Sequence, residues 1–148
     1  MKTIRIGSGA GYAGDRLEPA LELLEKGNLD YIAFECLAER TIALAQLEKL
    51  KNPNKGYNEL LEYRMEKVLP LAWKNRVKVI TNMGAANPIA GAEAIYRIAK
   101  DLGIKGMKIA AVIGDDVISN IENYKDITVW ETGEKLEALE GEIVSANA

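Results

Sequence analysis

The feature that most constrains the fold of this chain is a regular alternation of short apolar runs with longer segments of helical periodicity. The apolar and β-branched runs predict strands at 3–7, 31–34, 77–81 and 108–113, with a further short strand at 128–130. Helical spacing and capping residues predict a helix that is capped by Asp15 and ends at 26, helices at 37–51, 60–74 and 88–102, and a short helix at 117–123. Strands joined by helices form βαβ units, whose crossovers build a parallel sheet covered on both faces. We therefore expect an α/β protein with a mainly parallel sheet, in a Rossmann-like three-layer αβα arrangement of βα units.

Length and composition indicate one ordinary domain. The chain has 148 residues, of which 48% are hydrophobic and 28% are charged, as is typical of globular proteins. We interpret 1–148 as a single α/β domain in which 126–148 form a peripheral extension, because the residues after Trp130 are poor in hydrophobic side chains. Because the segment after Trp130 adds no core, it would leave apolar surface of the sheet uncovered. We therefore expect a homo-oligomer or a partner chain to complete the architecture.

The residue types that are absent exclude several kinds of chemistry. The sequence contains no histidine and one cysteine, so Ser-His-Asp sites, Cys-His sites and metal centres built on histidine or on paired thiols are excluded. The formal charge of -3 comes from interspersed acidic and basic residues, which does not favour nucleic acid as a partner. Since neither a membrane-spanning segment nor a signal peptide is evident, we expect a cytoplasmic protein without membrane contact. The missing ligand types also lead us to expect no metal site.

Polar or glycine-rich segments follow four of the predicted strands. They are the glycine loop at 7–14, the pair Glu35 and Cys36, the turn at 82–84 and the turn at 114–116. In open α/β sheets ligands bind beyond the carboxyl ends of the strands. The four segments are therefore expected to converge on a small-molecule site.

The glycine loop admits three interpretations. Gly9, Gly11 and Gly14 match the G-x-G-x-x-G pattern, and Glu35 ends the next strand at the distance that the dinucleotide fingerprint requires. An extra glycine at Gly7 and the carboxylate of Asp15 depart from that fingerprint. Nucleotide binding, binding of a carboxylate or other anion, and a purely structural turn all remain open.

Three residues are candidates for the reacting groups, namely Glu35, Cys36 and Asp115. Cys36 lies where a strand gives way to a helix, whose amino terminus would lower the pKa of a thiol, although a buried packing role is the simpler interpretation. Asp115 and its neighbour Asp116 are suited to hold Mg²⁺ or to act as acid or base, although capping of a short helix is the simpler interpretation. Glu39 and Arg40, in the first turn of the following helix, are ligand-binding candidates or a solvated surface pair.

The segment after the third main strand supplies further binding candidates. Asn82 and Asn87 are able to hydrogen-bond a ligand carbonyl or carboxylate, and Gly84 permits close approach of the backbone. Turn formation at Asn82 and capping of the helix that begins at Pro88 explain the two asparagines equally well.

Three sequence strings together resemble the AtuA-like family, which is named for acyclic terpene utilisation. They are RIGSGAGYAGDR at 5–16, FECLAERT at 34–41 and TNMGAANP at 81–88, and EIVSANA at 142–148 is also similar. The resemblance covers the whole chain. Because members of that family are usually longer, it implies that this chain corresponds to an amino-terminal portion, either a fragment or a subunit of a split protein.

The resemblance also implies a function. It points to a component of a catabolic enzyme that acts on a branched or terpenoid carboxylic acid or its acyl-CoA thioester, with a small-molecule anion or acyl-CoA as the ligand. The residues leave two alternatives open, a dinucleotide- or nucleotide-binding module and a non-catalytic scaffold subunit. Neither the residues nor the resemblance identifies a cofactor.

Overall fold

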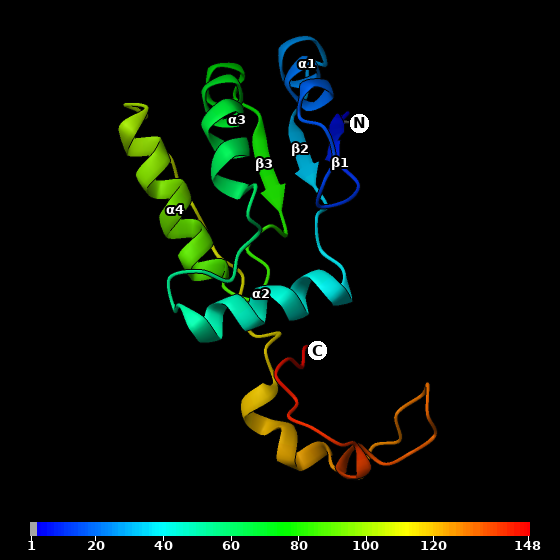
Figure 1. Cartoon of the computed structure of the whole chain (residues 1–148). Coiled ribbons are helices and arrows are strands. Elements are labelled where there is room, and N and C mark those ends of the chain that lie inside the picture. Colours follow the sequence, from blue (N-terminus) through cyan, green and yellow to red (C-terminus); the bar gives the residue numbers. More distant parts are fainter. Residues whose placement is uncertain (1–2) are drawn as a thin grey trace. The chain divides into compact units, whose positions relative to one another are not determined.

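The computed structural model describes residues 3–148 and has the expected α/β class (Figure 1). The chain divides into two compact units after Val112, and each is described by itself. The first unit contains three strands and four helices, which are β1 (Ile6–Ala10), α1 (Glu18–Lys26), β2 (Tyr31–Phe34), α2 (Glu39–Lys51), α3 (Leu61–Asn75), β3 (Lys78–Thr81) and α4 (Pro88–Asp101). The second unit contains two short 3₁₀ helices, η1 (Ile118–Tyr124) and η2 (Leu136–Ala138).

The sheet is entirely parallel, with the strand order β1-β2-β3. Ile32 of β2 lies opposite Gly7 of β1 and Val79 of β3, and the register shifts between Ser8 and Ala10. Because the strand order does not reverse, right-handed crossovers place the connecting helices on the same face of the sheet. The all-parallel open sheet is consistent with a Rossmann-like αβα fold, but in the first unit helices cover one face of the sheet and not both as expected. All three strands end at one edge (Figure 1).

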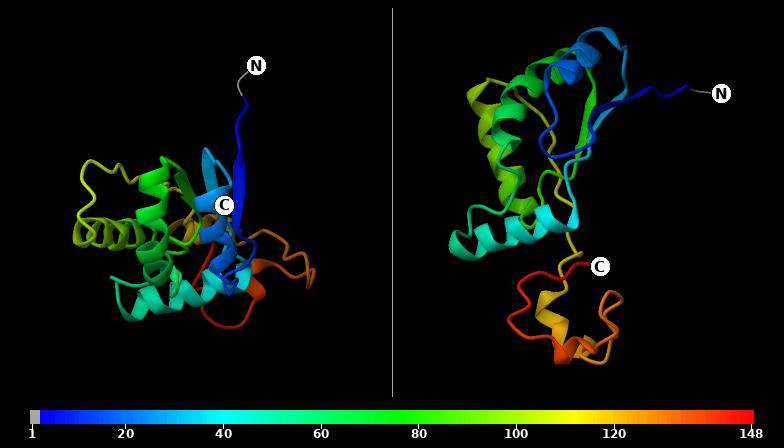
Figure 2. Two further views of the ribbon diagram at one scale, coloured as in Figure 1. Left: turned by 90° about the horizontal axis from the view of Figure 1, so that it is seen from above. Right: turned by 45° about the vertical axis from the view of Figure 1, so that its right-hand side comes forward.

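The core lies between the sheet and the layer formed by α1, α3 and α4. Helix α3 packs against α1 on one side and α4 on the other, and Figure 2 shows these helices on one side of the strands. The strands contribute Ile32 and Phe34, which are fully buried, and α3 contributes an apolar stripe. The opposite face of the sheet carries Ile6 and Ile80, whose exposed fractions are 69% and 57%.

Two predicted strands are wrong. Residues 108–113 form no regular element, and Val112 is 88% exposed. Residues 128–130 contribute one isolated antiparallel bridge, between Thr128 and Lys135. An apolar run becomes a strand only when a neighbouring strand accepts its backbone hydrogen bonds, and 108–113 has no such neighbour in the described part of the chain.

The start of the chain also needs correction. Strand β1 extends to Ala10, so Gly7 and Gly9 lie within the strand and not in a loop. Asp15 does not cap α1, whose N-cap residue is Leu17 and has no side-chain cap. The helix predicted from 37 begins at Glu39, and the short helix expected at 117–123 is the 3₁₀ helix η1.

The second unit has little regular structure and closes on its own carboxyl-terminal residues. Val117 donates its backbone N–H to Ala146 O (2.9 Å), and Ala148 donates to Asp115 O (2.8 Å).

None of the helices within residues 3–148 has both the length and the apolar character needed to cross a membrane.

Candidate functional site

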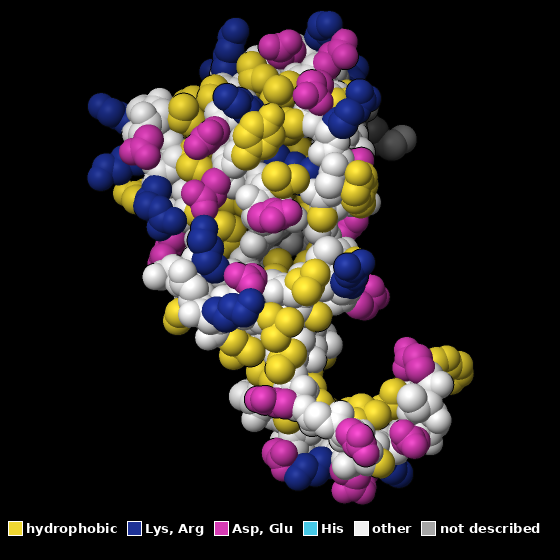
Figure 3. Space-filling view, viewed as in Figure 1, with side chains coloured by type: hydrophobic (Ala, Val, Ile, Leu, Met, Phe, Trp, Pro, Cys, Tyr) yellow, Lys and Arg dark blue, Asp and Glu magenta, His cyan; other side chains and the backbone are white. Residues whose placement is uncertain are grey.

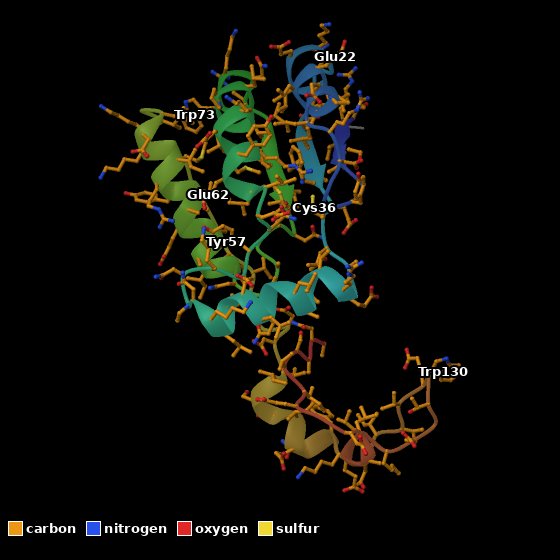
Figure 4. All side chains as sticks on the ribbon, viewed as in Figure 1. Glu22, Cys36, Tyr57, Glu62, Trp73 and Trp130 are labelled. Atoms are coloured by element: carbon orange, nitrogen blue, oxygen red, sulfur yellow. The ribbon has the colours of Figure 1, made fainter. Side chains whose placement is uncertain are left out.

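The carboxyl ends of the three strands form one hydrogen-bonded cluster. The Asn82 side chain joins the ends of β2 and β3, because its Oδ1 accepts from the Cys36 N–H (2.7 Å) and its Nδ2 donates to Glu35 Oε1 (2.9 Å). Glu35 Oε1 also accepts from the N–H of Leu37 (3.0 Å). Figure 4 shows Cys36 at this edge of the sheet. The structure therefore brings together Glu35, Cys36 and Asn82, as predicted.

The loop after β1 is held by its own aspartate. Asp15 Oδ2 accepts from the backbone N–H groups of Gly11 (2.6 Å) and Tyr12 (3.2 Å). In a dinucleotide-binding loop such N–H groups would face a pyrophosphate. Here a carboxylate of the chain already occupies them, so this geometry does not favour a bound phosphate.

Packing explains several glycines of the predicted loop. A Cβ on Gly9 would lie 2.7 Å from the Phe34 ring, one on Gly7 would lie 2.6 Å from Leu29, and one on Gly14 would lie 2.7 Å from the Tyr12 ring. By contrast, a Cβ on Gly11 would meet only Asp15 Oδ2, at 3.7 Å. Among these glycines, Gly11 is therefore the one at which a Cβ atom would fit without a close contact.

A buried arginine, Arg64 of α3, completes the cluster and was not predicted. Its Nη2 donates to the carbonyl oxygens of Ala13 (2.9 Å) and Asp15 (2.8 Å), and its Nη1 donates to Cys36 Sγ (3.0 Å). Arg64 is 1% exposed. A signal was present in the sequence, since Arg64 interrupts the apolar face of its helix at a spacing of three residues from Leu61.

Cys36 does not have the environment of an activated nucleophile. The thiol is buried, and it precedes the first residue of α2 by three positions. Burial raises the pKa of Cys36, while the nearby Arg64 guanidinium opposes that shift. Because loss of solvation outweighs the charge of Arg64, the structure favours the buried packing role of Cys36 over an activated thiol.

Glu35 has the opposite environment although it is the preceding residue. Its side chain is exposed, and the amide of Asn82, assisted by the N–H of Leu37, lowers the pKa of the carboxyl group. Glu35 is therefore ionised at neutral pH and is suited to accept a hydrogen bond.

A comparison with family models identifies the chain. The model described as "Acyclic terpene utilisation family protein AtuA" matches residues 4–148, which is essentially the whole sequence. The chain belongs to the AtuA family. No curated protein and no solved structure gives a significant match.

Other residues predicted for the site of this AtuA family chain have structural roles or surface positions. Asn87 Oδ1 accepts from the N–H of Ala90 (3.3 Å), as expected for a helix cap, and its Nδ2 donates to Pro53 O and Lys55 O, both at 2.8 Å. A Cβ on Gly84 would lie 2.7 Å from Pro88 Cα. The remaining two candidates, Glu39 and Arg40, are exposed in the first turn of α2.

Asp115 lies in the second unit of this AtuA family chain. Its Oδ2 accepts from Asn147 Nδ2 (2.9 Å), and Asp116 Oδ1 accepts from the N–H of Ile118 (3.1 Å) at the start of η1. The strand expected to carry these residues to the sheet edge is not formed. The structure thus shows three of the four predicted segments together.

The cluster of this AtuA family chain combines two groups of opposite character. It offers an ionised carboxylate at Glu35 and a buried thiol at Cys36 whose pKa is raised. Within residues 3–148 no group of three or more His, Cys, Asp or Glu side chains is placed to hold a metal ion. On the face in Figure 3, basic and acidic side chains are interspersed over the first unit.

Proposed function

We propose that this chain is a component of the breakdown of acyclic terpenes that binds a branched or terpenoid carboxylic acid, or its acyl-CoA thioester, at the carboxyl edge of the sheet. Membership of the AtuA family supports the involvement in acyclic terpene utilisation. The observation that carries the proposed site is the cluster in which Asn82 links Glu35 to Cys36 where two neighbouring strands end.

The charges of the cluster favour the thioester over the free acid. An ionised Glu35 repels a carboxylate but not the uncharged carbonyl of a thioester. Arg40, in the adjacent first turn of α2, is the side chain that we assign to a carboxylate or phosphate group of the ligand. In this proposal the phosphates of an acyl-CoA do not bind to the Gly11 and Tyr12 amides, which already bind Asp15.

The chemical role that we assign to Glu35 is that of a hydrogen-bond acceptor. Its carboxylate is exposed, and it is oriented by the amide group of Asn82. Cys36 contributes its backbone N–H to the cluster, and the pKa of its buried thiol is raised, so we assign it no nucleophilic role. Participation of Asp115 stays a prediction.

Calorimetric titration tests this proposal. Branched short-chain acyl-CoA thioesters, the matching free acids, free CoA, NAD and ATP are titrated into the wild-type chain and into Glu35→Ala. We expect the thioester to bind, and we expect Glu35→Ala to weaken binding about tenfold, as for loss of one hydrogen bond to a charged group. Glu25→Gln, in the last turn of α1, is the matched control that removes a carboxylate elsewhere on the surface.

Each of the other outcomes supports a different function. Binding of NAD or ATP that Glu35→Ala abolishes would support the nucleotide-binding alternative. The scaffold alternative would be supported by two results together. The chain would bind none of these compounds, and an assembly that contains it would retain its activity when Glu35 and Arg40 are replaced.

A further inference from the structure

We propose that Arg64 is a positioning residue, which joins the three loops of the candidate site into one preformed unit. The inference rests on the proposed function for what the loops bind. Its own basis is the geometry of the buried guanidinium, which contacts the segments after β1, β2 and β3.

The contacts of Arg64 are divided between its two terminal nitrogens. Nη2 donates to the carbonyl oxygens of Ala13 and Asp15, at 2.9 and 2.8 Å, in the loop after β1. Nη1 lies 3.0 Å from Cys36 Sγ and 3.7 Å from Met83 Sδ, which belong to the segments after β2 and β3. One rigid planar group therefore fixes the separation of three chain segments.

The position of Arg64 in its helix shows that apolar packing alone does not account for it. Leu61, Met65 and Val68 occupy the same buried face of α3, and a leucine or methionine at position 64 would avoid the cost of desolvating a guanidinium. What the guanidinium supplies in return is two hydrogen bonds to the partly buried backbone carbonyls of Ala13 and Asp15.

Two chains of hydrogen bonds lead from Arg64 to the exposed groups of the site. The first runs through Asp15, whose backbone carbonyl accepts from Arg64 and whose carboxylate holds the N–H groups of Gly11 and Tyr12. The second runs through Cys36, whose thiol contacts Arg64 and whose N–H donates to Asn82. Asn82 in turn donates to Glu35, so Arg64 positions the proposed acceptor without touching the ligand.

Amide hydrogen exchange, followed residue by residue by NMR on the ligand-free chain, tests this role in two variants. In Arg64→Met and Arg64→Lys we expect the N–H groups of Gly11, Tyr12 and Cys36 to exchange at least about tenfold faster than in the wild type, while amides within α4 keep their rates. Arg64→Lys should not restore the slow exchange, because a single ammonium group cannot reach both the carbonyl oxygens contacted by Nη2 and the sulfur atoms contacted by Nη1.

Leu69→Ala is the matched control. Leu69 is buried in the same helix at 3% exposure, so its truncation lowers stability through packing. We expect this variant to accelerate exchange in proportion to the overall loss of stability, without preference for the three loop amides. Uniform acceleration in the Arg64 variants, or unchanged loop amides, would overturn the proposal.

A measurement on the wild-type chain keeps the proposal testable if the Arg64 variants do not fold. Rotation about the Cζ–Nε bond of Arg64, observed through its Nη resonances, should be at least about tenfold slower than for the exposed Arg40. Equal rotation rates would contradict the assigned contacts.

The outcomes for Arg64 and for the proposed function are distinguishable. None of these measurements uses a ligand, so they stand whether or not acyl-CoA binds. If acyl-CoA binding is established, Arg64→Lys should weaken it about tenfold while Leu69→Ala should not.

Discussion

At the scale of single residues, Glu35 and Cys36 show how neighbours in the chain acquire opposite properties. Glu35 is exposed and receives two N–H donors, so the pKa of its carboxyl group is lowered. Cys36 is 2% exposed, so the pKa of its thiol is raised by burial. The turn from β2 toward α2 therefore presents a charged acceptor to solvent and keeps the thiol in the core.

The first residue-scale prediction concerns the reactivity of Cys36. Because the thiolate is the reactive form and the folded chain disfavours it, iodoacetamide at neutral pH should alkylate Cys36 at least about tenfold more slowly than a cysteine in an unstructured peptide. The rate in urea-unfolded chain, where burial is lost, should match the peptide. A native rate equal to or above that of the peptide would show that the helix amino terminus activates the thiol after all.

The second residue-scale prediction concerns the pH dependence of stability. The folded-state pKa of Glu35 lies below its ordinary value of 4.5, so ionised Glu35 stabilises the fold above that value, and this contribution is lost as the pH falls through the folded-state pKa. The difference in free energy of unfolding between the wild type and Glu35→Gln should therefore narrow as the pH falls from 7 to below 4.5.

Urea unfolding at a series of pH values measures this difference. Asn82→Ala removes the largest cause of the shift, so it should also reduce the pH-dependent part. In addition, Asn82→Ala should lower the free energy of unfolding by about 1 kcal/mol at every pH, because the N–H of Cys36 loses its acceptor. A difference between wild type and Glu35→Gln that is constant with pH would contradict the assigned shift.

At the scale of elements, β1 combines two kinds of glycine. Gly7 and Gly9 lie within the strand and allow Leu29 and Phe34 to pack against its backbone, whereas Gly11 lies in the loop that Asp15 holds. The G-x-G-x-x-G pattern is therefore divided between sheet packing and loop formation, and only its later part faces the site.

Alanine substitutions at Gly9 and Gly11 separate these two roles. Gly9→Ala should lower the free energy of unfolding by about 1–3 kcal/mol, because the added Cβ would lie 2.7 Å from the Phe34 ring. Gly11→Ala should change it by less than about 0.5 kcal/mol, since its added Cβ has no closer neighbour than Asp15 Oδ2 at 3.7 Å. Equal losses in urea unfolding would mean that close packing does not distinguish the two positions.

At the scale of the whole molecule, the first unit covers one face of its sheet and exposes the other. Ile6 and Ile80 lie on that exposed face, together with the partly buried Tyr31 and Ala33. Parallel sheets are normally covered on both faces, and an exposed apolar face favours association. We therefore expect the chain to self-associate or to bind a partner chain.

Light scattering across a concentration series tests this expectation. The mean mass of the wild type should rise with concentration as the chain associates. Ile80→Lys should move this association to at least about tenfold higher concentration, because burying a charged side chain in an interface is unfavourable. Glu25→Gln, on the helical side, serves again as a control and should leave the transition unchanged. A wild-type chain that stays monomeric at every concentration would contradict self-association.

Short-range patterns in the sequence determined most of the elements and the class of the fold. The apolar periodicities of α3 and α4 and the cap at Asn87 act within a few residues, and they are confirmed with shifts of at most one position. The placement of polar residues after successive parallel strands was also predictable, which is why Glu35, Cys36 and Asn82 meet as expected. These features depend on local geometry and on the direction of the strands.

The tertiary structure alone decided the environments of the site residues. Arg64 meets Cys36 across 28 residues of sequence and Ala13 across 51, and no local pattern encodes such partners. The same holds for 108–113, which has the composition of a strand but no partner strand in residues 3–148. Burial and hydrogen-bond partners are properties of the assembled core, so they fix which groups are charged, buried or held in place only once distant segments have packed together.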